Sequence, residues 1–75
     1  MKKSKVIATC LINSGFISSI DEAEAAVYKI FKDSYSDHDF NSWNKFIDPD
    51  MGQNIIKTVG QASHINVERF IKDLW

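Results

Sequence analysis

The chain has 75 residues, of which 44% are hydrophobic and 25% charged, and its formal net charge at pH 7 is −1. This length predicts one small helical domain, residues 1–75, and the apolar content excludes an intrinsically disordered chain. The single cysteine, Cys10, excludes an intramolecular disulfide and a cysteine-based zinc site, so a reducing cytoplasm is the expected compartment.

A basic start followed by a short apolar stretch before Cys10 has the outline of a lipoprotein signal. The stretch, residues 6–9, is well short of the roughly 7–15 apolar residues of a signal core. No segment approaches the roughly 18 apolar residues of a membrane span. Neither secretion nor a membrane association is therefore expected, and a bacterial or phage origin fits this small size.

The first predicted helix covers residues 4–14, where Val6, Ile7, Cys10 and Leu11 repeat with helical spacing. Gly15 follows at the position where a helix often ends in the left-handed conformation.

The second predicted helix begins near Ser19 and ends between residues 32 and 35. Ser19 and Glu22 have the spacing of a capping box. Val27 lies on the apolar face of this helix, whereas Tyr28 lies about 100° away from that face and is expected to stay partly exposed.

A polar connection, residues 34–39, precedes a short third helix that Phe40, Trp43, Phe46 and Ile47 mark. Asp48 and Pro49 end this helix and begin the fourth, as N-cap and first helical residue. The fourth helix has an apolar stripe of Met51, Ile55, Val59 and Ala62.

The last predicted helix covers residues 66–75, and Val67, Phe70, Ile71 and Leu74 share one of its faces. Because no segment alternates like a strand, the expected fold is all-α, a compact bundle of four or five short helices. The predicted core consists of Val6, Ile7, Leu11, Val27, Ile30, Phe31, Ile55, Val59, Phe70, Ile71 and Leu74.

Two patterns in the sequence resemble a catalytic or metal-binding site but lack features that such sites need. The spacing of Asp37, Asp39, Asn41 and Asp48 resembles a calcium loop, but the glycine and the bidentate glutamate of such a loop are missing. Cys10 with a histidine would make a nucleophile and base, yet Cys10 lies on an apolar stripe. No enzyme activity, metal or cofactor is therefore expected.

Residues 54–75 have the outline of a helix-turn-helix unit, which would bind DNA through Asn66, Arg69 and Lys72. The exposed face of its second helix has no net charge, because Glu68 and Asp73 accompany the two basic residues. Such a helix gains little from phosphate contacts. DNA binding is therefore the second hypothesis for this chain.

The charge is distributed unevenly along the chain. Residues 1–20 carry three lysines and no acid, whereas residues 21–50 carry eight acids and three lysines. Acids beside aromatic residues are typical of a binding surface, although a solvated acidic face has the same composition. The first hypothesis is therefore a non-enzymatic, protein-binding regulator or inhibitor, with a second copy of the chain as another possible partner. Its predicted contact residues are Asp33, Tyr35, Asp37, Asp39 and Trp43.

Overall fold

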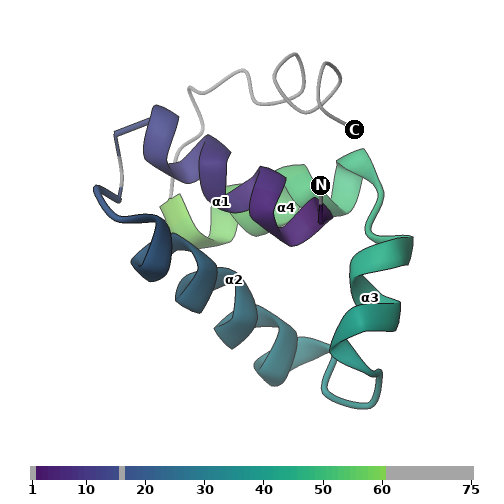
Figure 1. Ribbon diagram of the computed structural model, residues 1–75. Helices are drawn as coiled ribbons and strands as arrows, with labels where there is room; N and C mark the ends of the chain where they lie inside the picture. The colour runs from purple at the N-terminus through teal and green to yellow at the C-terminus, as the bar shows by residue number, and fades with distance from the viewer. Residues whose placement is uncertain (1, 16, 61–75) are drawn as a thin grey trace.

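The structure is a computed structural model, and it describes residues 2–15 and 17–60 of the chain. Over these residues the chain forms four α-helices and no strand, which confirms the predicted all-α fold (Figure 1). The predicted fifth helix, residues 66–75, lies outside the described residues. None of the described helices is both long and apolar enough to cross a membrane.

Helix α1 spans Lys3–Asn13 and packs against α2, α3 and α4. Its predicted stripe is buried, and Ala8 is buried as well. The helix ends as predicted, because Gly15 has a φ of +82° and its amide donates to the carbonyl oxygen of Ile12 over 3.0 Å. Only glycine adopts this left-handed conformation without strain.

Helix α2 spans Ile20–Ser34, and Ser19 is its N-cap residue. The predicted capping box is wrong in one respect, because the Ser19 side chain makes no cap hydrogen bond. The Ser19 carbonyl oxygen accepts the first helical bond, from the amide of Ala23. Ala23 and Val27 are fully buried, so packing holds this end of the helix.

Helices α3 (Phe40–Phe46) and α4 (Pro49–Gly60) both begin at an aspartate cap. Asp39 Oδ2 accepts the amide hydrogen of Ser42 over 3.2 Å, and Asp48 Oδ1 accepts that of Met51 over 2.7 Å. Each carboxylate satisfies a backbone amide that has no partner within its helix.

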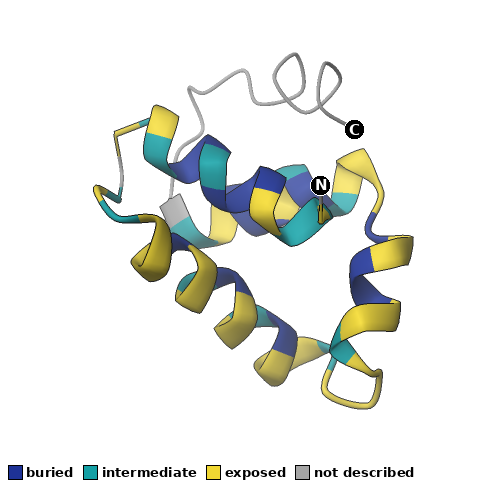
Figure 2. Ribbon diagram, in the orientation of Figure 1, coloured by how far each residue is buried: buried dark blue, intermediate teal, exposed yellow. Residues whose placement is uncertain are grey.

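The core lies between α1 and the other three helices (Figure 2). Six predicted core residues are buried: Val6, Ile7, Leu11, Val27, Phe31 and Ile55. Ile30 and Val59 are only half-buried and pack against the edge of the core, while Phe70, Ile71 and Leu74 lie outside the described residues. The prediction omitted Trp43, Ile47 and Ile56, which are all fully buried. Ile56 was missed because the buried face of α4 also includes Gly52 and is broader than the predicted stripe.

Candidate functional site

Of the five predicted contact residues, one is buried and four are exposed or half-buried. Trp43 is fully buried, so its assignment to a contact surface is corrected. Its ring packs against the rings of Phe31, Tyr35 and Phe40, with centroids 5.1, 5.6 and 5.8 Å away. The reason is that α3 presents Trp43 to the core and turns Phe46 outward, which leaves Phe46 46% exposed.

The remaining four predicted residues face different neighbours. Asp33 and Tyr35 line a small hollow of about 250 Å³ between α2 and α4. Asp37 lies at the α2–α3 turn, 3.7 Å from His38 Nε2. Asp39 is used as the cap of α3. All three aspartates are exposed, at the end of α2 and in the connection to α3.

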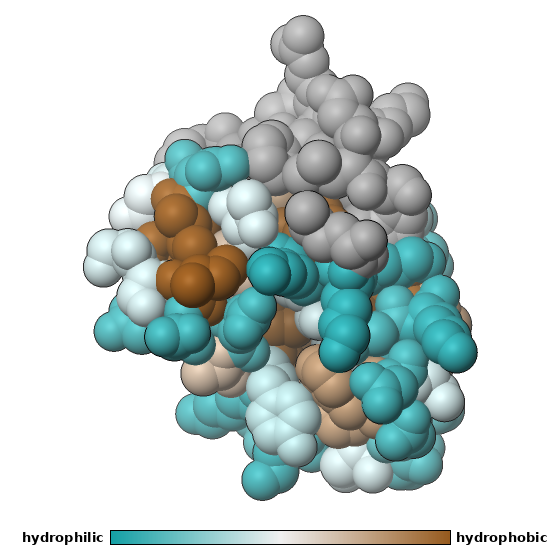
Figure 3. Space-filling view, viewed as in Figure 1, coloured by the Kyte–Doolittle hydropathy of each residue, from teal (hydrophilic) through white to brown (hydrophobic). Residues whose placement is uncertain are grey.

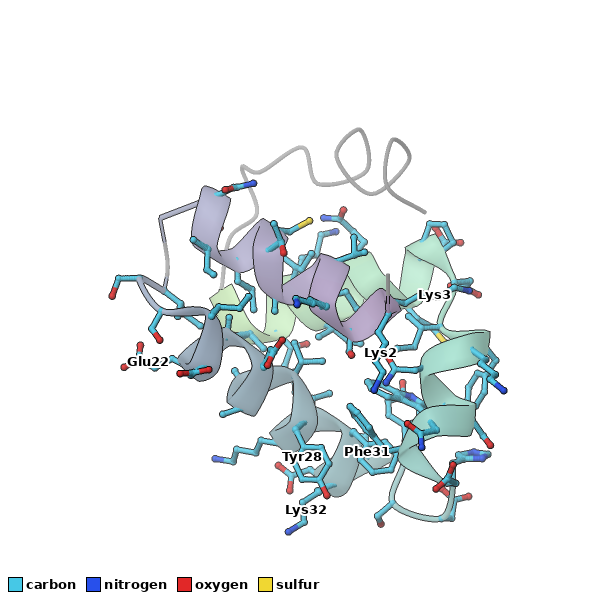
Figure 4. All side chains as sticks on the ribbon, in the orientation of Figure 1. Lys2, Lys3, Glu22, Tyr28, Phe31 and Lys32 are labelled. Atoms are coloured by element: carbon cyan, nitrogen blue, oxygen red, sulfur yellow. The ribbon has the colours of Figure 1, made fainter. Side chains whose placement is uncertain are left out.

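A larger groove lies where α1, α2 and α3 meet. It encloses about 860 Å³ and is called the aromatic groove here; its lining residues are Lys2, Ser4, Lys5, Glu24, Ala25, Tyr28 and Phe40. Figure 4 shows Tyr28 beside Phe31 on the side of α2 that faces α3, with Lys2 at the start of α1. The groove thus combines aromatic rings with basic side chains.

The aromatic rings of the groove are the outer end of a continuous cluster. Tyr28 is 45% exposed, and its ring meets the half-buried ring of Phe40 edge to face, with centroids 5.1 Å apart. Phe40 in turn packs on Phe31, which packs on the buried Trp43. The exposed rings are held by buried ones, so their orientation is set before any partner binds.

A second hollow, the lysine hollow, adjoins the groove through their shared residue Lys2. It encloses about 780 Å³ and is lined by Lys2, Lys3, Asn41, Asn44 and Lys45. Lys3 Nζ donates to the carbonyl oxygens of Lys45 and Ile47, over 3.0 and 2.8 Å. Asn44 Oδ1 accepts the backbone amide of Ser4 over 2.9 Å.

These bonds join the start of α1 to the end of α3 in both directions. The Asn44 oxygen caps an amide at the N-terminus of α1, and the Lys3 ammonium pairs with carbonyls at the C-terminus of α3. The amide oxygen thus faces the positive end of one helix dipole, and the ammonium faces the negative end of the other. The two hollows are therefore built on a fixed junction of α1 and α3.

Most of the groove and hollow was missed by the sequence analysis. Lys2, Lys5 and Asn44 had no assigned role, although the basic N-terminus was a signal for the first two. Tyr28 was expected to be partly exposed, which is confirmed. The sequence did not predict that Tyr28 lies near Phe40 and Lys2. Phe40 is the first residue of α3, and Lys2 precedes α1.

Other predicted features are placed as follows. The described residues contain no group of three or more His, Cys, Asp or Glu side chains able to hold a metal, and Asn41 lies within α3 and not in a loop. Cys10 is buried, and burial raises the pKa of its thiol to about 11. The DNA-binding alternative, Asn66, Arg69 and Lys72, lies outside the described residues.

Comparisons with protein-family models, curated proteins and solved structures find no match to this chain. The two hollows and the side chains around them are therefore the features from which a function is inferred.

Proposed function

We propose that the protein acts without chemistry of its own, by binding a partner protein at the aromatic groove and thereby regulating or inhibiting that partner. The observation that carries this proposal is the exposed ring of Tyr28, fixed against Phe40 at the surface end of a packed aromatic cluster. Rigid aromatic side chains in a hollow are typical of the residues that dominate binding energy. Lys2 and Lys5 beside them supply a polar rim.

The test is affinity capture from source cells with three immobilised proteins: wild type, Tyr28→Ala and Phe46→Ala. Phe46 is the matched control, because it is 46% exposed against 45% for Tyr28 but does not line the groove. A captured protein should be lost with Tyr28→Ala, with affinity reduced about 30-fold, and retained with Phe46→Ala. Full retention by Tyr28→Ala would contradict the proposal.

A second contact surface is favoured by the surroundings of Phe46. Its ring meets that of His38, with centroids 5.1 Å apart, and His38 lies beside Asp37. This arrangement keeps the acidic and aromatic character that the sequence predicted, with Phe46 in place of Trp43. If this is the working surface, Phe46→Ala and a charge reversal at Asp37 would weaken capture, and Tyr28→Ala would not.

The same capture separates protein binding from the DNA hypothesis. Bound material that disappears after nuclease treatment, and in variants with Arg69→Ala and Lys72→Ala, would favour the helix-turn-helix alternative. Protein that survives nuclease treatment and depends on Tyr28 would favour the groove.

A further inference from the structure

The lysine hollow and the aromatic groove differ in the chemistry they offer. The hollow is lined entirely by lysine and asparagine, whereas the groove has the rings of Tyr28 and Phe40. Lys2 lines both, so the two hollows adjoin at this residue. Figure 4 shows Lys2 and Lys3 together at the start of α1, beside α3.

The charges around these two hollows are strongly unbalanced. Four lysines, Lys2, Lys3, Lys5 and Lys45, line one or the other, and Glu24 is the acidic residue among the linings. Within the described residues, no carboxylate lies within 4.0 Å of the ammonium groups of Lys2, Lys5 or Lys45. The described lining of the two hollows is therefore net positive, although the whole chain is net acidic.

Asn44 provides an independent sign of a missing acceptor. The residue is only 6% exposed and lines the lysine hollow, and its Oδ1 is used by the amide of Ser4. Its Nδ2 is buried and has no hydrogen-bond partner among the described residues. A buried donor without a partner costs about 1–3 kcal/mol, so a ligand oxygen bound there would recover that energy.

We infer that the two hollows together receive an acidic segment of the partner protein. One apolar side chain of the segment packs on Tyr28 and Phe40, and adjacent carboxylates bind at the lysine hollow, facing Lys2, Lys45 and Asn44 Nδ2. This inference rests on the proposed function and adds the chemical class of the partner. Charge complementarity sets which segments bind and how fast they associate.

A nucleic acid fits these observations less well than an acidic peptide. Tyr28 and Phe40 meet at an interplanar angle of 70°, so they do not offer the parallel stacking faces that successive bases use. The adjoining helix α2 has exposed acids at Asp21, Glu22 and Glu24 along its solvent side. They would repel a nucleic acid, which carries a charge at every phosphate, along its whole length, whereas a peptide needs carboxylates only at the lysine hollow.

The inference is tested by titrating the full-length, ¹⁵N-labelled protein with a capped peptide of sequence EELFEE. The expected result is salt-sensitive binding that shifts the amide signals of Ser4, Tyr28 and Lys45. An analogue without charge, QQLFQQ, should bind about tenfold more weakly, and EEAAEE should also lose affinity. Equal affinity of EELFEE and QQLFQQ, or the absence of shifts at these residues, would overturn the inference.

Lysine variants with the same charge change locate the acidic half of the ligand. Lys45→Glu should weaken binding of EELFEE about tenfold, whereas Lys32→Glu should change it less than about twofold. Lys32 is the control because it is exposed and lines neither the groove nor the lysine hollow. An equal effect of both variants would show that net charge, and not the hollow, governs binding.

The outcomes also separate this inference from the proposed function. If QQLFQQ binds as tightly as EELFEE and Tyr28→Ala abolishes binding of both, the groove binds proteins but the acidic preference is wrong. If a single-stranded oligothymidine binds more tightly than EELFEE and shifts the same signals, the ligand class is wrong. If EELFEE binds at the lysines and Tyr28→Ala leaves its affinity unchanged, the role of the groove is wrong.

Discussion

Asn44 is the one buried polar residue in the described part of the chain, and its side chain hydrogen-bonds to the backbone of another helix. Its oxygen caps α1 from a position 40 residues away in sequence. Lys3 of α1 in turn donates to the carbonyl oxygens of Lys45 and Ile47, which are 42 and 44 residues away. Asn44 and Lys3 thus join the start of α1 to the end of α3, beside the lysine hollow.

Replacing Asn44 should therefore destabilise the fold. Asn44→Ala removes the acceptor for the Ser4 amide and should lower the free energy of unfolding by about 1–2 kcal/mol. Asn41→Ala is the matched control, because Asn41 is exposed on the same helix and should change stability by less than about 0.5 kcal/mol. Urea denaturation of both variants checks this, and equal stabilities would contradict the capping role.

The thiol of Cys10 should be almost unreactive in the folded protein. With its pKa raised to about 11 from an ordinary value of 9.0, the thiolate fraction at pH 8 falls about 100-fold. Reaction with a chromogenic disulfide reagent should accordingly be at least that much slower in buffer than in denaturing urea. Rates within a factor of a few would show that Cys10 is accessible.

The same raised pKa makes the contribution of Cys10 to stability depend on pH. Because the folded-state pKa lies above the unfolded one, the contribution is complete below about pH 9 and is lost as pH rises from about 9 to 11. The free energy of unfolding of the wild type, compared with Cys10→Ala at each pH, should therefore decrease over this range. A difference that stays constant would contradict the burial of the thiol.

At the scale of the helix, the N-termini of α2, α3 and α4 are fixed in two ways. Helices α3 and α4 use aspartate side chains, whereas Ser19 precedes α2 without a side-chain bond. The first two starts are local properties of the sequence, because each cap bond joins residues three apart. The start of α2 depends on the burial of Ala23 and Val27.

The caps should consequently differ in strength. Asp48→Ala removes a 2.7 Å bond to the Met51 amide and should cost about 1 kcal/mol of stability. Ser19→Ala removes no side-chain bond and should cost at most a few tenths of a kcal/mol. Thermal denaturation of the two variants distinguishes them; the reverse order would mean that the capping box does form.

At the scale of the whole molecule, the aromatic cluster joins the core to the surface. It runs from the buried Trp43 through Phe31 and Phe40 to the exposed Tyr28. Figure 3 shows a surface that is largely hydrophilic on this face, with separate apolar patches. The rings that line the groove are thus the solvent-exposed end of the aromatic cluster that packs α2 against α3.

Two ring deletions in α3 should therefore have very different effects on stability. Trp43→Ala should cost about 3–5 kcal/mol, a large part of the roughly 5–15 kcal/mol that stabilises a domain. Phe46→Ala should cost less than about 1 kcal/mol, because this ring is 46% exposed. Denaturation midpoints check the order, and a larger loss for Phe46→Ala would contradict the orientation of α3.

The sequence by itself determined the helical class, the four described helices and most of their ends, since these depend on spacings of three or four residues and on local caps. It did not determine which residues of the apolar face of α3 are buried, because Phe40, Trp43 and Phe46 lie within about 120° of one another on that short helix. Likewise, the sequence shows that Lys2 and Lys45 are charged and that Tyr28 is aromatic. It does not show that these residues line two adjoining hollows. Tertiary packing decided both, because contacts across some 40 residues arise only when α1 and α3 meet.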